Sequence, residues 1–159
     1  MIILIRHAEK KKDSIHLSHK GVLRANYLAD YFKFPYGEFN VPSRVVAMSQ
    51  HHHGSSDRCF ETVAPVCKSL SIQHVKSNIS KNHVKQVVDY VNQMKFSKET
   101  ILICWEHTMI PIIAHLLGYP VTSWGMNPLS ANEKAGKHCY DATWVIDLKK
   151  RNSFCLSTI

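Results

Sequence analysis

The chain has 159 residues, of which 45% are hydrophobic and 20% are charged. This balance is typical of a globular protein and excludes a disordered chain. Twenty lysines and arginines against twelve acidic residues give a formal net charge of +8, with eleven histidines in addition. A basic chain favours anionic partners. Its basic residues are scattered, however, with no aromatic-interleaved basic stretch, so we do not expect nucleic acid among those partners.

The cysteines and the N-terminus bear on location. The five cysteines are odd in number and form no CxxC pair, which argues against a disulfide framework and for a reducing compartment. The N-terminal apolar run, Met1–Ile5, is too short for a signal peptide. No apolar run approaches the ~20 residues of a transmembrane span. We therefore expect a cytoplasmic protein with no membrane partner and a single domain over residues 1–159.

Strand-like and helix-like segments alternate along the chain, as in α/β folds. Met1–Ile5 predicts a first strand. Ser18 is a candidate helix cap, and a helical apolar pattern follows it. The apolar positions of that pattern are Val22, Ala25, Leu28, Ala29 and Phe32. Residues 34–42 contain prolines and a glycine and predict a loop. Val45–Met48 then predicts a second strand.

The polar residues 49–57 predict a loop, and a second helix is expected from Arg58. Pro65 lies inside this helix and should kink or divide it. The residues expected to face inward are Phe60, Val63, Cys67 and Leu70. Ile72–Val75 predicts a short third strand, and Ser80 a cap for a third helix. The apolar stripe of that helix is Val84, Val87, Val88 and Val91.

Ile101–Trp105 is a strongly apolar run that predicts a fourth strand. A helix after His107 should end at Gly118, and Pro111 falls in its first turn, where proline is accepted. The expected inward residues of this helix are Ile110, Ile113, Ala114 and Leu117.

The C-terminal part of the chain does not continue the alternation of strands and helices. Residues 119–142 show no regular pattern, whereas Thr143–Leu148 and Phe154–Thr158 predict a hairpin about a basic turn. Together the elements predict a three-layer α/β/α sandwich with a mostly parallel central sheet and helices on both faces.

Three segments place polar side chains at the same kind of position. Arg6 and His7 follow the first strand, Arg58 opens the helix after the second, and His107 follows the fourth. If these strands are parallel, all four side chains project from one edge of the sheet, where open α/β sheets bind ligands. A helix N-terminus there adds N–H groups and a positive dipole end, both of which favour phosphate.

Four motifs, in order, resemble those of the histidine phosphatase superfamily, also called phosphoglycerate mutase-like. They are Arg6-His7-Ala8-Glu9, similar to the RHG(E) signature; residues 17–29, similar to LTxxGxxQAxxLA; residues 56–65, similar to SxxRxxxTAxP; and Glu106-His107, similar to the second-histidine motif. The matches span roughly residues 1–118. The resemblance implies the fold of that superfamily.

The resemblance also implies roles for the site residues. His7 would attack phosphorus to form a phosphohistidine, which water then hydrolyses. Arg6 and Arg58 would bind the phosphoryl oxygens and lower the pKa of His7 toward its unprotonated form. His107 would be a further donor to the phosphate. Since these groups supply the positive charge, neither a metal nor a cofactor is expected.

The expected activity is that of a metal-independent phosphatase, a phosphoric monoester hydrolase of the histidine acid type. Its substrate would be a phosphorylated small molecule or a phosphoprotein, carrying a phosphomonoester or a phosphoramidate. The short interval between Arg58 and His107 leaves no room for a cap domain, so we expect an open pocket. Two alternatives stay open: a non-catalytic phosphate-binding or scaffold module, and a mutase-type phosphotransferase.

The sequence departs from the family pattern in three places. Ala8 replaces the usual glycine, which a negative φ would allow. The general acid is not assigned: Asp13 and Glu106 are the candidates, although strand alternation would aim Glu106 away from His107. A missing acid favours aryl phosphates or phosphoramidates, which need less protonation than alkyl esters. His51–His53 lengthen the loop before Arg58 and are interpreted as a solvated, substrate-facing loop rather than a metal site.

Overall fold

A computed structural model describes residues 1–34, 40–49, 56–94, 97–119, 140 and 142–148, and the backbone of 152–157. Over these residues the chain forms six strands and four helices. In chain order they are β1 (Ile2–Arg6), α1 (His19–Tyr31), β2 (Arg44–Met48), α2 (Arg58–Ser69), β3 (His74–Ile79), α3 (Val84–Met94), β4 (Ile101–Trp105), α4 (Ile110–Leu116), β5 (Ala142–Asp147) and β6 (Asn152–Ser157).

The strands form one sheet in the order β3-β2-β4-β1-β5-β6. β1 and β2 both pair in parallel with β4, and β3 pairs in parallel with β2. β5 runs antiparallel to β1, and β6 antiparallel to β5. The carboxyl ends of β1, β2, β3 and β4 therefore lie at one edge of the sheet, as the site prediction required.

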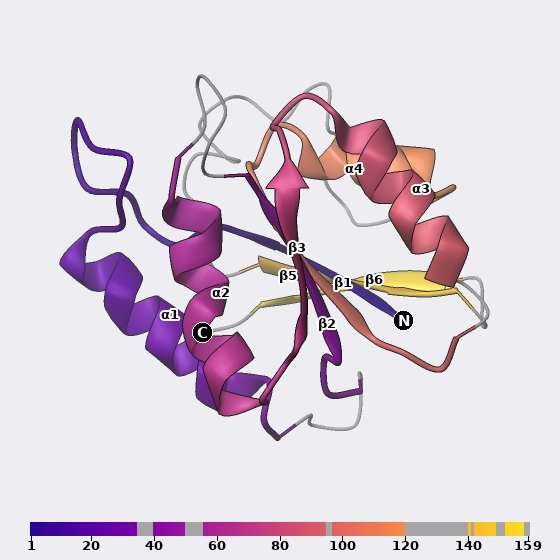
Figure 1. The fold of residues 1–159 in the computed structure, drawn as a ribbon, viewed down its shortest axis with the longest axis horizontal. Coiled ribbons are helices and arrows are strands. Elements are labelled where there is room, and N and C mark those ends of the chain that lie inside the picture. The colour runs from indigo at the N-terminus through magenta and orange to yellow at the C-terminus, as the bar shows by residue number, and fades with distance from the viewer. Residues whose placement is uncertain are drawn as a thin grey trace.

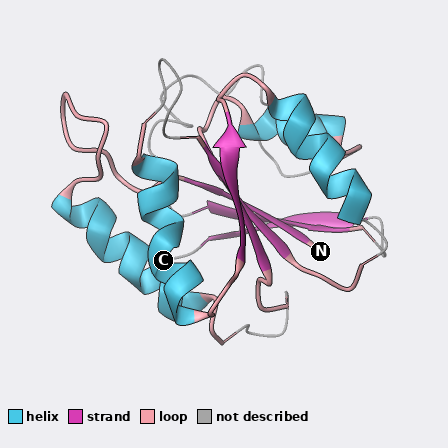
Figure 2. Cartoon of the chain, viewed as in Figure 1, coloured by secondary structure: helices cyan, strands magenta, loops and turns pink. Residues whose placement is uncertain are grey.

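The helices cover both faces of this sheet (Figure 1). α1 and α2 pack against each other on one side, and α3 and α4 on the other. Figure 2 shows the same arrangement, with the strands as a central layer between two helical layers. The three-layer α/β/α sandwich with a mostly parallel sheet is confirmed. The single domain over residues 1–159 stays a prediction.

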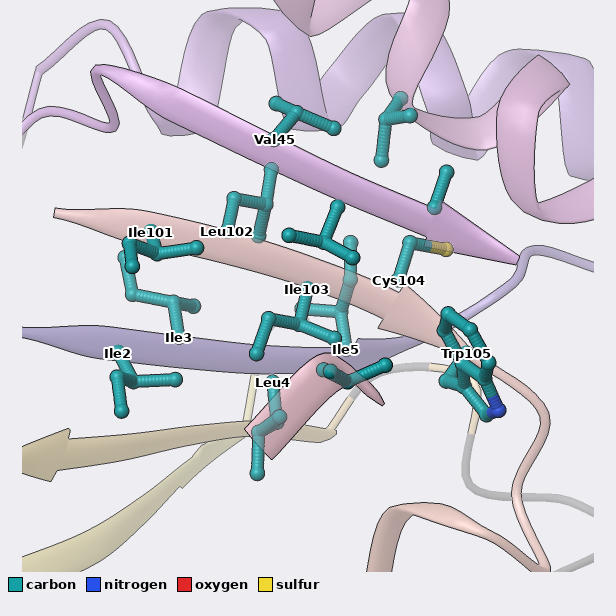
Figure 3. Packing of buried hydrophobic residues seen from close by; sticks show 14 of the residues in the cluster. Ile2, Ile3, Leu4, Ile5, Val45, Ile101, Leu102, Ile103, Cys104 and Trp105 are labelled. Carbon is teal, nitrogen blue, oxygen red and sulfur yellow. The ribbon is translucent and has the colours of Figure 1, made fainter. Parts of the chain in front are cut away.

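The core is built on the two central strands, β1 and β4, whose side chains Figure 3 shows. Every residue of both strands is buried. A strand covered by helices on both faces is apolar without alternation, which explains why both runs were recognisable in the sequence. Because these strands lie side by side in the sheet, the residues that follow them, His7 and Glu106, are also brought close.

The start of α1 is held against the segment that follows β1. Ser18 caps the helix as predicted: its hydroxyl accepts from the Gly21 N–H at 3.1 Å. The Ser18 N–H and hydroxyl both donate to the carbonyl of Glu9. A Cβ at Gly21 would lie 2.2 Å from that same carbonyl oxygen, so only glycine fits here. Val22, expected to face inward, is exposed instead.

α2 is one helix from Arg58 to Ser69, so Pro65 does not divide it. Its buried residues are Cys59, Thr62, Val63 and Val66. Of the four residues expected to face inward, only Val63 is fully buried, whereas Phe60, Cys67 and Leu70 are partly buried. Val63, Cys67 and Leu70 do pack in or against the core, but the buried face extends further, because it includes polar Thr62, which the apolar pattern does not mark.

Two elements, the edge strand β3 and the helix α3, begin later than predicted. β3 covers His74–Ile79 rather than Ile72–Val75, and as an edge strand it carries polar residues that blur its pattern. α3 begins at Val84, and Ser80 does not cap it; the Ser80 hydroxyl lies 2.7 Å from the His83 ring. The four valines of the predicted stripe are all buried.

The remaining elements agree with expectation. α4 buries Ile110, Ile113 and Ala114, and Gly118 follows it with φ +88°. β5 and β6 pair antiparallel from Ala142↔Ser157 to Asp147↔Asn152, as the predicted hairpin required. Its turn and the greater part of residues 119–142 lie outside the described residues, as do residues 35–39 and 50–55, which belong to the two predicted loops.

Among the described helices, none combines the length and apolar composition needed to cross a bilayer.

Candidate active site

A cavity of about 220 Å³ opens at the carboxyl edge of the parallel strands. All four predicted side chains line it, together with others that the sequence did not single out. The lining residues are Arg6, His7, Lys10, Met48, Ser56, Arg58, Lys81, Glu106, His107 and Tyr140. Residues far apart in the chain thus meet where β1, β2 and β4 end.

His7 is the most constrained of these side chains. It is only 2% exposed, and its backbone N–H donates to the carbonyl of Trp105 at the end of β4. Its ring Nδ1 lies 2.7 Å from the Ala8 carbonyl oxygen. Because a carbonyl only accepts, Nδ1 carries the proton and Nε2 keeps its lone pair. The backbone therefore fixes the tautomer in which the lone pair lies on Nε2.

The same ring is neutral at pH 7. Burial and, to a smaller extent, the charges of Arg6 and Arg58 lower the pKa of His7 to about 4, although the Ala8 carbonyl and Glu106 act to raise it. The sequence predicted the arginines as the cause; desolvation is the larger effect because the ring lies inside the fold. Ala8 itself is not among the residues with positive φ, so its Cβ is tolerated.

Arg6 lies beneath an aromatic ring. Its guanidinium carbon is 4.0 Å from the centre of the Tyr140 ring, and its Nη2 donates to the Tyr140 hydroxyl at 3.3 Å. The Tyr140 and His7 rings are 6.2 Å apart between centres. Cation–π contact of this kind orients a guanidinium. Tyr140 was not predicted, because nothing in the irregular pattern of residues 119–142 marks it.

Arg58 opens α2 and is coupled to the segment after β1 through Thr62. The Thr62 hydroxyl donates to the Arg58 carbonyl at 2.6 Å and accepts from the Ala8 N–H at 2.9 Å. Arg58 Nε is buried and has no hydrogen-bond partner within the described part of the chain. A buried guanidinium N–H without a partner is suited to an anionic ligand.

Glu106 and His107 lie against each other, contrary to the prediction from strand alternation. Glu106 Oε1 is 2.7 Å from His107 Nδ1, close enough for an ion pair although not aligned as a hydrogen bond. β4 ends at Trp105, so alternation no longer governs these two residues. Glu106 Oε2 also faces Lys81 Nζ at 3.5 Å and accepts from the Thr108 N–H and hydroxyl.

These contacts decide the protonation of Glu106. Burial raises its pKa, but the contacts with His107 and Thr108 and the charge of Lys81 outweigh burial and bring it to about 2. Glu106 is therefore ionised at neutral pH and has no proton to give. The other candidate acid, Asp13, is exposed with φ +52° and does not line the cavity.

The fixed charges of the cavity are strongly unbalanced. Four lining side chains are permanent cations, and one, Glu106, is an anion. The cations are Arg6, Lys10, Arg58 and Lys81. A concave site with an excess of guanidinium and ammonium groups favours a multiply charged anion. His51–His53 fall outside the described residues, so their predicted role stays a prediction.

Comparison with known proteins shows which structures this chain resembles. No family model and no curated protein matches the sequence. Among solved structures, the chain is similar to a candidate phosphohistidine phosphatase SixA from Nakamurella multipartitia, with 16% identity over 98% of this chain and 92% of that chain and a TM-score of 0.55. It is also similar to the protein histidine phosphatase SixA complexed with tungstate, with 15% identity over 99% and 96% and a TM-score of 0.60. The chain therefore shares the fold of these two SixA structures.

Proposed function

We propose that the protein is a metal-independent phosphatase that transfers a phosphoryl group first to His7 and then to water. The observation that carries this proposal is the state of His7: a buried, neutral imidazole whose Nδ1 is engaged by the Ala8 carbonyl, in a cavity lined by four fixed cations. Such a ring presents an unprotonated Nε2 to an anion that the cations attract.

The reaction has two steps. His7 Nε2 attacks phosphorus, the bond from phosphorus to the leaving group breaks, and a phosphohistidine forms. Water then attacks the same phosphorus, the P–N bond breaks, inorganic phosphate leaves and Nε2 regains its lone pair. Arg6 and Arg58 bind the phosphoryl oxygens and stabilise the charge of both transition states. His107 completes the set of donors.

The substrate class follows from the cavity and the leaving group. A cavity of about 220 Å³ is small and suits a phosphoryl group at the end of a side chain or on a small aromatic ring. Two proteins of the same fold carry names that specify phosphohistidine or protein histidine phosphatase. We propose phosphoramidates and aryl phosphates as substrates, with a phosphorylated protein side chain as the physiological form.

The test uses 4-nitrophenyl phosphate and chemically phosphorylated histidine with the wild-type protein and His7→Ala. Wild-type protein should turn over in the presence of EDTA, and the variant should lose at least about 1,000-fold in kcat/KM because nucleophile removal costs about that much or more. Rapid quenching should trap a protein-bound phosphate that is labile in acid and stable in base. Turnover retained by folded His7→Ala would contradict the proposal; phosphate binding without turnover would indicate a binding module.

A further inference from the structure

The proposed reaction needs a proton for the departing group, and neither acid considered from the sequence supplies it. Asp13 is outside the cavity, and Glu106 is ionised. The inference that follows rests on the proposed function and concerns the neighbour of Glu106. His107 also lines the cavity, and its ring is fixed on one side by that carboxylate.

The first step concerns Nδ1 of His107. This atom is buried, and Glu106 Oε1 lies 2.7 Å from it. An ionised carboxylate has only lone pairs to present, so a ring nitrogen that close to it must carry a proton. Nδ1 is therefore protonated, and Nε2 is the ring nitrogen left to meet a substrate.

The second step concerns Nε2 of the same ring. The oxygens of a phosphoryl group are acceptors, like those of the carboxylate. A ring that lies between two acceptor-only groups makes both contacts favourably only when both of its nitrogens carry protons. A phosphoryl group bound against Nε2 would therefore make both contacts favourable only with the imidazolium form of His107, which has a transferable proton on Nε2.

We propose that the His107 imidazolium is the general acid of the phosphoryl transfer, and that Glu106 is the residue that positions and charges it. As His7 Nε2 forms its bond to phosphorus, the bond to the leaving atom breaks, and that atom takes the proton from His107 Nε2. His107 becomes neutral and can accept a proton from the water that later attacks the phosphohistidine. Protons and bonds balance over the cycle.

The surroundings of Glu106 are suited to this task. Its second oxygen accepts from the N–H and hydroxyl of Thr108 and faces Lys81 Nζ at 3.5 Å. The Lys81 carbonyl in turn accepts from the Trp105 indole N–H at 3.1 Å. These contacts hold the carboxylate in one orientation, and thereby the ring beside it. Lys81 is also an alternative proton donor, because its ammonium group lines the cavity.

The experiment measures kcat/KM for a graded series of aryl phosphates, from 2,4-dinitrophenyl to unsubstituted phenyl phosphate. This parameter reports the step in which the leaving group departs, even where a later step limits kcat. The proteins are wild type, His107→Gln, Glu106→Gln and Lys81→Met. Glutamine at position 107 keeps a hydrogen-bond donor but has no transferable proton. Because all substrates are compared within each variant, partial unfolding lowers every rate equally and leaves the slope unchanged.

We expect His107→Gln to lose about 100-fold or more on phenyl phosphate and far less on 2,4-dinitrophenyl phosphate, whose leaving group needs no proton. Glu106→Gln should steepen the slope in the same direction, by a smaller factor. Lys81→Met removes a cation that attracts every substrate, so it should lower all the rates and change the slope less than Glu106→Gln does. A uniform loss across the series in His107→Gln would overturn this inference, yet leave the proposed function intact. A steepened slope in Lys81→Met alone would assign the proton to Lys81 and also overturn it.

Discussion

Two histidines of this chain lie against carboxylates at almost the same distance, in very different surroundings. His107 Nδ1 is 2.7 Å from Glu106 Oε1, and His16 Nδ1 is 2.6 Å from Glu61 Oε1. The Glu106 side chain is 15% exposed and lines the cationic cavity. The His16 side chain is 54% exposed and that of Glu61 32%, outside the cavity.

The comparison shows that the effect of a histidine–carboxylate pair depends on its exposure to water and on neighbouring charges more than on the distance between the two groups. Around His16, water screens the charges, so the pair contributes little free energy. The pair has a structural role instead. Glu61 also accepts from the Leu17 N–H at 2.8 Å, and this contact holds the segment before α1 against α2. Around His107, the contacts with the ring and with Thr108 and the charge of Lys81 keep the Glu106 carboxylate ionised despite its burial. Of the two pairs, only that of His107 lines the cavity.

The contrast between the two histidines is tested most directly by removing each imidazole in turn. His107→Ala should lower kcat/KM for phenyl phosphate by about 100-fold or more, because a proton donor and a phosphate ligand are both lost. His16→Ala should leave kcat/KM close to wild type. Steady-state kinetics on the two purified variants make the measurement. Similar losses in both would contradict the distinction drawn here.

The next prediction concerns acid stability. The pKa of Glu106 in the folded protein is about 2, below its ordinary value of 4.5, so its ionised form stabilises the fold above pH 4.5, and this contribution is lost as the pH falls toward 2. Glu106→Gln should therefore lower the free energy of unfolding by up to about 3 kcal/mol at pH 6, and by less at pH 3. Urea titrations at both pH values test this.

The control for that titration is Glu61→Gln at pH 6, where the exposed carboxylate should contribute less than about 1 kcal/mol. A difference between wild type and Glu106→Gln that stays constant from pH 6 to pH 3 would show that the charge of Glu106 has no part in stability.

A third prediction contrasts the two sides of α2. Thr62→Val keeps the shape of the side chain but removes the acceptor for the buried Ala8 N–H, which should cost about 1–3 kcal/mol in the free energy of unfolding. Glu61→Gln, the adjacent residue on the exposed side, retains an oxygen for the Leu17 N–H and should cost less. Equal losses in urea unfolding would show that the Thr62 bridge contributes nothing.

The smallest effect is expected for the surface pair alone. A double-mutant cycle of His16→Ala and Glu61→Gln should give a coupling free energy of less than about 1 kcal/mol, which decreases further as salt is added. Thermal or urea unfolding at two ionic strengths measures it. A coupling that is larger and insensitive to salt would mean that this pair, too, is shielded from water.

The parts of the fold that the sequence predicted well are those where one physical requirement dominates. β4 at Ile101–Trp105 and the stripe of four valines in α3 are determined by burial alone. β3 is shifted because an edge strand does not need apolar residues on both faces. The inward face of α2 was predicted only in part, because Thr62 is buried for its hydrogen bonds rather than its hydrophobicity, and an apolar pattern carries no information about hydrogen bonds.

The site divides in the same way. Arg6, His7, Arg58 and His107 each adjoin a regular element, so topology could bring them to one edge. Other lining residues could not be found so: Lys10, Lys81 and Tyr140 lie in segments without a regular pattern. The contact between Glu106 and His107 was missed because the side-chain directions of a strand were extended past its last residue.

β1 is an interior strand, paired on one side with β4 and on the other with β5. The His7 imidazole thus follows directly on a strand in the interior of the sheet, whereas three other lining residues, Lys10, Ser56 and Tyr140, belong to connecting segments. Of these three, only Lys10 is exposed, whereas Ser56 is buried and Tyr140 packs on Arg6, so substitutions at Lys10 can alter selectivity with the least effect on His7. Redesign for new phosphorylated compounds should begin there.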